Sequence, residues 1–246
     1  MPLTWLTNTQ RKRWKNETAL HPHAQTFTPV RLRPSHRHWL VTRIPVVQLS
    51  MRVLVACEYS GAVRDAFLRA GHYAASCDLL PSDSPLGDHY QCDVRDILDH
   101  DWDMMVAHPP CTYLCSSGLH WNKRRPERAQ QTEEALAFVR LLLEAPVPRI
   151  ALENPIGCIS TRIRKPDQVV QPWQYGHDAS KATCLWLKGL PLLQPTDVLP
   201  GGKGARRANQ TPSGQNRLPP SADRWKIRSE TYSGIADAMA QQWGNL

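Results

Sequence analysis

The chain has 246 residues, of which 41% are hydrophobic and 21% charged, a composition typical of soluble globular proteins. That length allows one α/β domain with a full core and excludes two large domains. The formal net charge is +8, but residues 1–50 hold eight of the 30 Lys and Arg residues and one of the 22 Asp and Glu residues. The rest of the chain is nearly neutral, so the overall charge is weak evidence for a nucleic-acid partner.

Residues 1–50 differ in composition from the remainder and show no sustained helical or strand period. We expect this basic segment to be extended or disordered. One alternative is an arm that holds nucleic acid; another is a transit peptide, although Pro22, Pro29 and Pro34 would interrupt its amphipathic helix. We favour a third interpretation, in which Met51 is the true start and residues 1–50 are an upstream extension.

The cysteines number seven, and all of them lie beyond residue 50. An odd number cannot pair completely within one chain, and the N-terminus lacks the pattern of a signal sequence. We therefore expect free thiols and a cytoplasmic location. Cys111 and Cys115 form a CxxxC without a second pair, so we expect no metal site. No apolar run reaches the length of a membrane span, so we expect no membrane association.

From Met51 onward, strand patterns alternate with helix patterns. Short apolar runs predict buried strands at residues 53–57, 73–77, 103–107 and 149–152. Helical spacing of apolar residues predicts helices at residues 62–70 and 127–144. This alternation favours an α/β domain over residues 51–246, with a doubly wound, mostly parallel sheet.

Polar and reactive side chains follow four of the predicted strand ends. Glu58 and Asp78 come after the first two strands, Cys111 stands in a Pro-Pro-Cys turn after the third, and Glu153-Asn154 closes the fourth. The carboxyl ends of parallel strands lie at one edge of the sheet, where ligands of such folds bind. We therefore expect these groups to share one site.

Two of these motifs resemble the DNA (cytosine-5)-methyltransferase family, and most closely its short, phage-type members. HPPCTYLCSSG, residues 108–118, resembles the family's nucleophile loop, and ALENP, residues 151–155, resembles its Glu-Asn motif. The resemblance covers the chain from Met51 onward. It implies a Rossmann-like SAM-dependent methyltransferase fold, S-adenosyl-L-methionine (SAM) as cofactor and Cys111 as nucleophile.

The resemblance extends to less specific motifs. CEYSGAVRDAF, residues 57–67, stands in the place of the first SAM-binding loop, and TYSGIADAMAQQW is similar to the closing helix. The cofactor-binding residues that the resemblance implies are Glu58, Ser60, Gly61, Asp78, Asp93 and Pro109. Lys181 stands where the family has an arginine and is expected to contact the base. Further candidates for substrate contact are Arg162, Arg164 and Trp121.

The expected chemistry explains why a thiol and a carboxyl group are needed together. C5 of cytosine is a poor nucleophile until a thiolate adds to C6, which is the role predicted for Cys111. A free thiol has a pKa of about 8.5, and His108 is a candidate to favour its thiolate form. Glu153 would protonate or hydrogen-bond N3 of the base, and Asn154 would hold the loop backbone or the base edge.

The expected substrate depends on residues 191–230, which stand in place of a target-recognition domain. This segment is too short and too poor in apolar residues for a folded domain, so we expect a flexible loop that grips phosphates. The predicted substrate is duplex or single-stranded DNA, methylated with weak sequence specificity and without an obligatory protein partner. One alternative is modification of free dCMP. Another is a non-catalytic DNA-binding protein.

Overall fold

The computed structural model describes residues 50–246, and the predictions for residues 1–49 lie outside the described residues. Within the described part, no helix combines the length and apolar character that crossing a membrane requires. These residues form one seven-stranded sheet with the order β3-β2-β1-β4-β5-β7-β6. The strands are β1 (Arg52–Ala56), β2 (Tyr73–Asp78), β3 (Asp88–Gln91), β4 (Met104–Ala107), β5 (Arg149–Pro155), β6 (Gln168–Val170) and β7 (Thr183–Lys188).

The sheet is wound in two directions from its centre. From β1 the chain runs outward through β2 to β3, and it then returns to β4 on the other side of β1. The five strands β3, β2, β1, β4 and β5 pair in parallel. β7 pairs antiparallel with both of its neighbours, β5 and β6. The predicted fold class, a Rossmann-like, doubly wound and mostly parallel sheet, is confirmed. The order reverses between β1 and β4, which is where open α/β sheets bind ligands.

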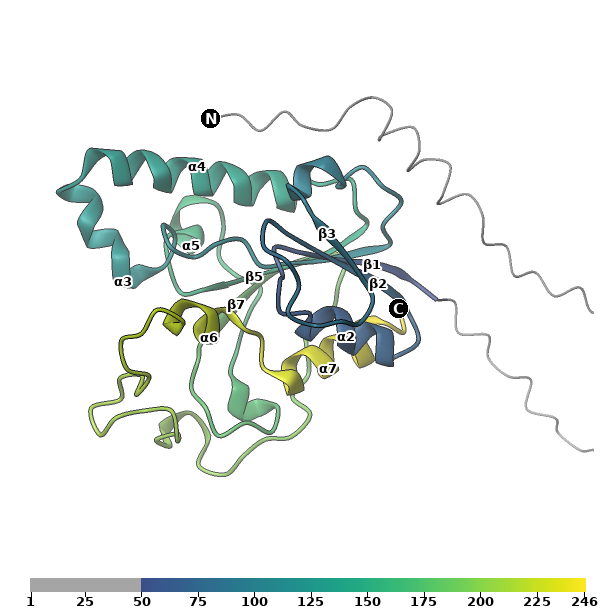
Figure 1. The fold of residues 1–246 in the computed structure, drawn as a ribbon. Coiled ribbons are helices and arrows are strands. Elements are labelled where there is room, and N and C mark those ends of the chain that lie inside the picture. Colours follow the sequence, from purple (N-terminus) through teal and green to yellow (C-terminus); the bar gives the residue numbers. More distant parts are fainter. Residues whose placement is uncertain (1–49) are drawn as a thin grey trace, which may run out of the picture. The chain divides into compact units, whose positions relative to one another are not determined.

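Helices cover both faces of this sheet (Figure 1). The α-helices are α2 (Ala62–Arg69), α3 (Ser116–Leu119), α4 (Pro126–Leu143), α5 (Ile159–Arg162), α6 (Arg224–Ser229) and α7 (Ser233–Trp243). The 3₁₀ helices are η1 (Val94–Asp96), η2 (His120–Lys123), η3 (Pro172–Gln174) and η4 (Gly202–Gly204). In Figure 1, α4 lies on one side of the sheet, and α2 and α7 lie together on the other.

Successive side chains of the central strands point to opposite faces of the sheet, and a hydrophobic core lies on each face. Leu54 and Ala56 of β1 belong to the core cluster that includes Leu136 and Val139 of α4. Val53 and Val55 point to the opposite side, into the cluster with α2 and α7. Burial of both faces explains why the parallel strands have continuous apolar sequences.

The structure also contains strands that apolar runs did not predict. β3 has the polar sequence DHYQ and lies at the sheet edge, so it lacks the signal of a buried strand. β5 extends through Pro155 because β7 pairs with it beyond the last residue of β4. Glu153 and Asn154 therefore lie within a strand, and not after it as predicted, although they project past the end of the parallel sheet.

Residues 191–230, predicted to be a flexible loop, contain η4 and α6 joined by irregular backbone. Arg207 is buried in this segment, where its guanidinium donates to the carbonyl oxygens of Pro200 and Gly202 at 3.2 and 2.9 Å. The same guanidinium lies 5.1 Å from the ring centroid of Trp173. The two hydrogen bonds hold residues 200–207 together, and the contact with Trp173 joins this segment to η3.

Candidate active site

A cavity of about 100 Å³ lies at the carboxyl ends of β1, β4 and β5, beside the point where the strand order reverses. It is lined by residues 57–60 after β1, 108–111 after β4, 153–155 of β5, Lys181 before β7 and residues 228–231 at the end of α6 and directly after it. The structure thus brings Cys111, Glu153 and Asn154 together, as the sequence predicted. Of the predicted cofactor and base contacts, Glu58, Ser60, Pro109 and Lys181 also line this cavity.

The nucleophile loop is fixed from several sides. Asn154 Nδ2 donates to the carbonyl oxygen of Pro109 at 2.7 Å, so Asn154 holds the loop backbone, one of its two predicted roles. On the far side, Arg128 of α4 donates to the carbonyl oxygens of Thr112 and Gly118 at 2.8 and 3.3 Å. The Cys111 carbonyl accepts the backbone N–H of Cys115 at 3.0 Å, which closes a tight turn. Cys111 is therefore presented by an ordered loop.

Gly157 lets this loop approach the segment after β5. Its backbone bridges Cys115, and a Cβ at this position would lie 2.0 Å from the carbonyl oxygen of Leu114. We expect Gly157→Ala to displace the nucleophile loop, lowering the free energy of unfolding by about 1–3 kcal/mol and any Cys111-dependent rate by up to about 100-fold. Calorimetry and alkylation of Cys111 measure the two effects. Gly204→Ala is the control because a Cβ there meets nothing within 4 Å; equal effects of both substitutions would contradict the prediction.

The Cys111 thiol is paired with a second thiol. A hydrogen bond with Cys115, followed by burial, raises the pKa of Cys111, and the same hydrogen bond lowers the pKa of Cys115. The positive charge of Lys181 acts in the opposite direction and favours the Cys111 thiolate. Cys115 is thus the group with the largest effect on the pKa of Cys111, and its effect is opposite to the role that the sequence had suggested for His108, which was to favour the thiolate.

His108 instead pairs with Glu153. Its Nδ1 lies 2.9 Å from Glu153 Oε2, and their side chains are 14% and 10% exposed. Thr231 Oγ1 donates to the same carboxylate oxygen at 3.3 Å. Thr231 was missed as a site residue because its motif was assigned to the closing helix, which begins two residues later at Ser233.

Backbone conformation changes sharply where β1 enters the cavity. Cys57 has φ 59°, the one positive φ of a non-glycine residue among residues 50–246. Glu58 then accepts the backbone N–H groups of Val63 and Arg64 at 2.7 and 3.2 Å, which ties this turn to the start of α2. Burial raises the pKa of Glu58. Gly61, with φ 77°, caps α2 in the left-handed conformation.

Asp78 and Asp93 lie beside the cavity and not in its lining. Burial, followed by the negative charges of these two carboxylates, raises the pKa of Cys57 to about 12. Asp78 accepts the backbone N–H of Leu80 at 2.9 Å. Asp93 caps η1 and forms an ion pair with Arg95.

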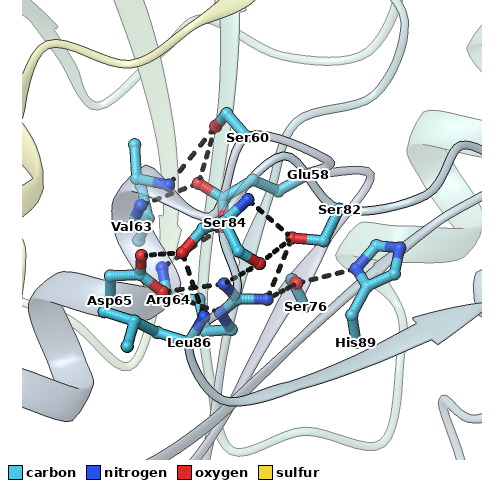
Figure 2. A network of polar contacts seen from close by, with 11 residues as sticks. Glu58, Ser60, Val63, Arg64, Asp65, Ser76, Ser82, Ser84, Leu86 and His89 are labelled. Carbon is cyan, nitrogen blue, oxygen red and sulfur yellow. Dashed lines mark hydrogen bonds and ion pairs between the residues drawn. The ribbon is translucent and has the colours of Figure 1, made fainter.

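A buried arginine network supports the loop after β2 (Figure 2). Arg64 of α2 is 0% exposed and forms an ion pair with Asp65 at 2.8 Å. Its Nη1 donates to the hydroxyls of Ser76 and Ser82 at 2.9 and 3.3 Å, and Ser84 donates to Asp65 at 2.5 Å. The network therefore joins α2, β2 and residues 79–87 beside the cavity.

We expect Arg64→Met to lower the free energy of unfolding by about 3–5 kcal/mol, because it leaves Asp65 without its buried partner. Urea denaturation followed by circular dichroism measures this loss. Arg69→Met is the matched control on the same helix, since Arg69 pairs with Asp237 at an exposed site and should contribute less than about 1 kcal/mol. Similar losses for both variants would show that the network does not stabilise the fold.

Three predicted substrate contacts lie outside the cavity lining. Arg162 forms an ion pair with Glu133, and Arg164 forms one with Asp167, so both guanidinium groups have protein partners. Trp121 is 39% exposed in η2, with two arginine side chains over its ring. Residues 50–246 contain no group of three or more His, Cys, Asp or Glu side chains arranged to hold a metal ion.

The fold and cavity define a doubly wound α/β protein with a thiol and a buried carboxylate at its switch point. No protein-family model matches the chain, and neither does any curated protein. Among solved structures, the chain is similar to the Dnmt2 methyltransferase of S. pombe, with 15% identity, 64% of this chain covered and a TM-score of 0.40. The chain spans 58% of the length of that protein. The functional assignment therefore depends on the residues of the cavity.

Proposed function

We propose that this protein is a SAM-dependent methyltransferase that modifies C5 of cytosine in DNA, with Cys111 as its nucleophile. The observation that carries the proposal is the presence of Cys111 and Glu153 in the lining of one cavity at the sheet's switch point. Covalent addition to cytosine needs a thiolate at C6 and a proton donor at N3, and these two side chains supply the required groups.

The residues around the cavity fit a polar, cationic cofactor such as SAM. Two buried atoms, Nε2 of His108 and Oδ1 of Asn154, have no hydrogen-bond partner among the described residues, so a polar ligand would satisfy them. The carboxylates of Glu58, Asp78 and Asp93 lie at or just after the ends of β1, β2 and β3, where they would accept hydrogen bonds from ribose hydroxyls and amino groups. When bound, SAM supplies an electrophilic methyl group to C5.

Each catalytic side chain has a defined task in this proposal. The Cys111 thiolate, formed as Cys115 accepts its proton, adds to C6 of cytosine, while a proton passes from Glu153 to N3. This addition makes C5 nucleophilic. After C5 is methylated, its proton passes to solvent water, departure of the Cys111 thiolate restores the aromatic ring, and N3 returns its proton to Glu153. Lys181 would contact the base carbonyl and stabilises the thiolate through its charge.

DNA is the proposed substrate because Lys181 and Arg228 line the cavity and further basic side chains follow the nucleophile loop and precede the closing helix in the sequence. Residues 191–230 contain seven Lys or Arg and three Asp or Glu residues, and Arg228 of this segment lines the cavity. Trp121, Arg124 and Arg125 form an exposed aromatic and cationic group soon after the nucleophile loop. Such groups bind phosphates and stack on bases without reading a sequence, so we expect weak sequence specificity.

Transfer of labelled methyl from SAM to duplex DNA, single-stranded DNA and dCMP tests this proposal. The full chain should produce 5-methylcytosine in DNA, identified by mass spectrometry of the nucleosides. Label on dCMP alone would replace DNA by a free nucleotide as substrate. SAM binding, measured by calorimetry, without transfer to any of these would reject the cytosine-C5 activity, and absence of SAM binding would reject the methyltransferase.

A further inference from the structure

His108 and Glu153 are brought together by the parallel pairing of β4 and β5. Ala107, the last residue of β4, is in register with Leu152, so the next residue on each strand lies at the same level beyond the ladder. The His108 Nδ1 to Glu153 Oε2 distance of 2.9 Å is that of a charge-assisted hydrogen bond. The other ring nitrogen, Nε2, is buried without a partner among the described residues. This imidazole is thus held by one strong contact, to the carboxylate proposed to act on the base.

The charges around the pair determine which partner carries the proton. Burial by itself would lower the pKa of His108, but the hydrogen bond and charge of Glu153, with the charge of Glu58, raise it above 6.5, whereas Lys181 opposes this rise. Burial would raise the pKa of Glu153, but His108, Lys181 and Thr231 together lower it to about 2. Arg228 and Glu230 also line the cavity. Near neutral pH the proton therefore lies on the imidazole, and Glu153 is an anion.

An ionised Glu153 has no proton of its own to give to N3. We propose that His108 is the proton source of the reaction: it holds at Nδ1 the proton that passes through Glu153 to N3 of the bound cytosine. As Cys111 adds to C6, the N–H bond of His108 breaks and an N–H bond forms at N3, so that imidazolium becomes neutral imidazole. When the thiolate departs, the proton returns along the same route. This inference rests on the proposed cytosine methylation.

The test compares the pH dependence of kcat for the wild-type protein and His108→Gln at saturating SAM. Wild-type activity should fall as pH rises through the pKa of the imidazolium. In His108→Gln the alkaline limb should move to lower pH, because Glu153 must then carry the proton itself and a carboxyl group ordinarily titrates about two units below imidazole. The loss should be about 100-fold at pH 8 and clearly smaller at pH 5.5. His100→Gln is the matched control. His100 precedes β4, at the amino-terminal end of that strand, and the variant should retain the wild-type pH profile of kcat.

Two results would overturn the role of His108 while leaving the proposed function intact. The first is equal loss of activity at both pH values, which a packing role predicts. The second, available even if the variant does not fold, is an NMR titration of the wild-type protein in which the His108 imidazole is neutral above pH 6. A wild-type protein that binds SAM but transfers no methyl group to cytosine would instead overturn the proposed function, and this inference with it.

Discussion

Replacement of Cys111 by alanine is expected to lower methyl transfer to cytosine by about 10⁴-fold or more, because no covalent addition to C6 can occur without the thiolate. This loss of activity should come from the missing thiolate and not from unfolding of the protein. Cys111 is partly exposed, so its replacement should change the free energy of unfolding by less than about 0.5 kcal/mol. SAM should also bind the variant with unchanged affinity.

The measurement is single-turnover transfer of labelled methyl to DNA, with the thermal midpoint and SAM affinity recorded on the same preparations. Cys158→Ala is the control, since Cys158 is buried at the start of α5 and does not line the cavity. An active Cys111→Ala protein would exclude covalent catalysis and leave direct methylation of a nitrogen atom as the simplest chemistry.

Cys115→Ala tests separately what controls the pKa of the Cys111 thiol. The hydrogen bond that the Cys111 thiol donates to Cys115 is the largest cause that raises the pKa of Cys111, so its removal should lower that pKa. Alkylation of Cys111 by iodoacetamide at pH 7.5 should then be faster than in the wild-type protein, because the thiolate is the reactive form. An unchanged or slower reaction would mean that the pairing of the two thiols does not control the ionisation of Cys111.

Glu153→Gln should have the second largest effect, a loss of about 10²–10⁴-fold in kcat at pH 7. The amide can accept the hydrogen bond of His108, but it cannot carry a proton to N3. The affinity for DNA should change little, so the effect should appear in kcat and not in KM. A loss confined to KM would assign Glu153 to substrate binding.

The same substitution has a pH-dependent effect on stability. The pKa of His108 is raised, so its interaction with Glu153 contributes fully below 6.5 and is lost as pH rises through the folded-state pKa. The pKa of Glu153 is lowered from 4.5 to about 2, so its contribution is complete above 4.5 and is lost as pH falls through about 2. The pair therefore stabilises the fold fully between pH 4.5 and pH 6.5, where Glu153 is an anion and His108 is charged.

Glu153→Gln should accordingly lose more free energy of unfolding at pH 5.5, where His108 is charged, than at a pH above the raised folded-state pKa of His108. Urea denaturation at the two pH values measures the difference, with Glu133→Gln as the control. Glu133 pairs with Arg162 on the surface, so its replacement should cost less than about 1 kcal/mol at either pH. An equal loss for Glu153→Gln at both pH values would show that the His108–Glu153 pair is not ionic.

Local sequence determined the central elements and the position of the reactive groups along them. Apolar runs identified β1, β2, β4 and β5 to within a few residues, because a strand buried on both faces is mostly apolar. The reactive side chains follow those runs, and parallel strands end at one edge of the sheet. The meeting of Cys111 and Glu153 in one cavity was therefore predictable without knowing the complete topology.

Only the tertiary structure decided which polar groups pair, since periodicity reports burial within an element and carries no information on distant partners. Arg64 has the sequence position of a solvated helix residue, yet serines from β2 and the following loop allow it to be fully buried. The register of β4 against β5 brings His108 next to Glu153. The turn after Pro110 brings Cys111 next to Cys115. β3 escaped prediction because an edge strand need not be apolar. The antiparallel direction of β7 was also not predicted, because it depends on the neighbouring strands. The sequence thus specified the reactive groups, and long-range packing specified their protonation.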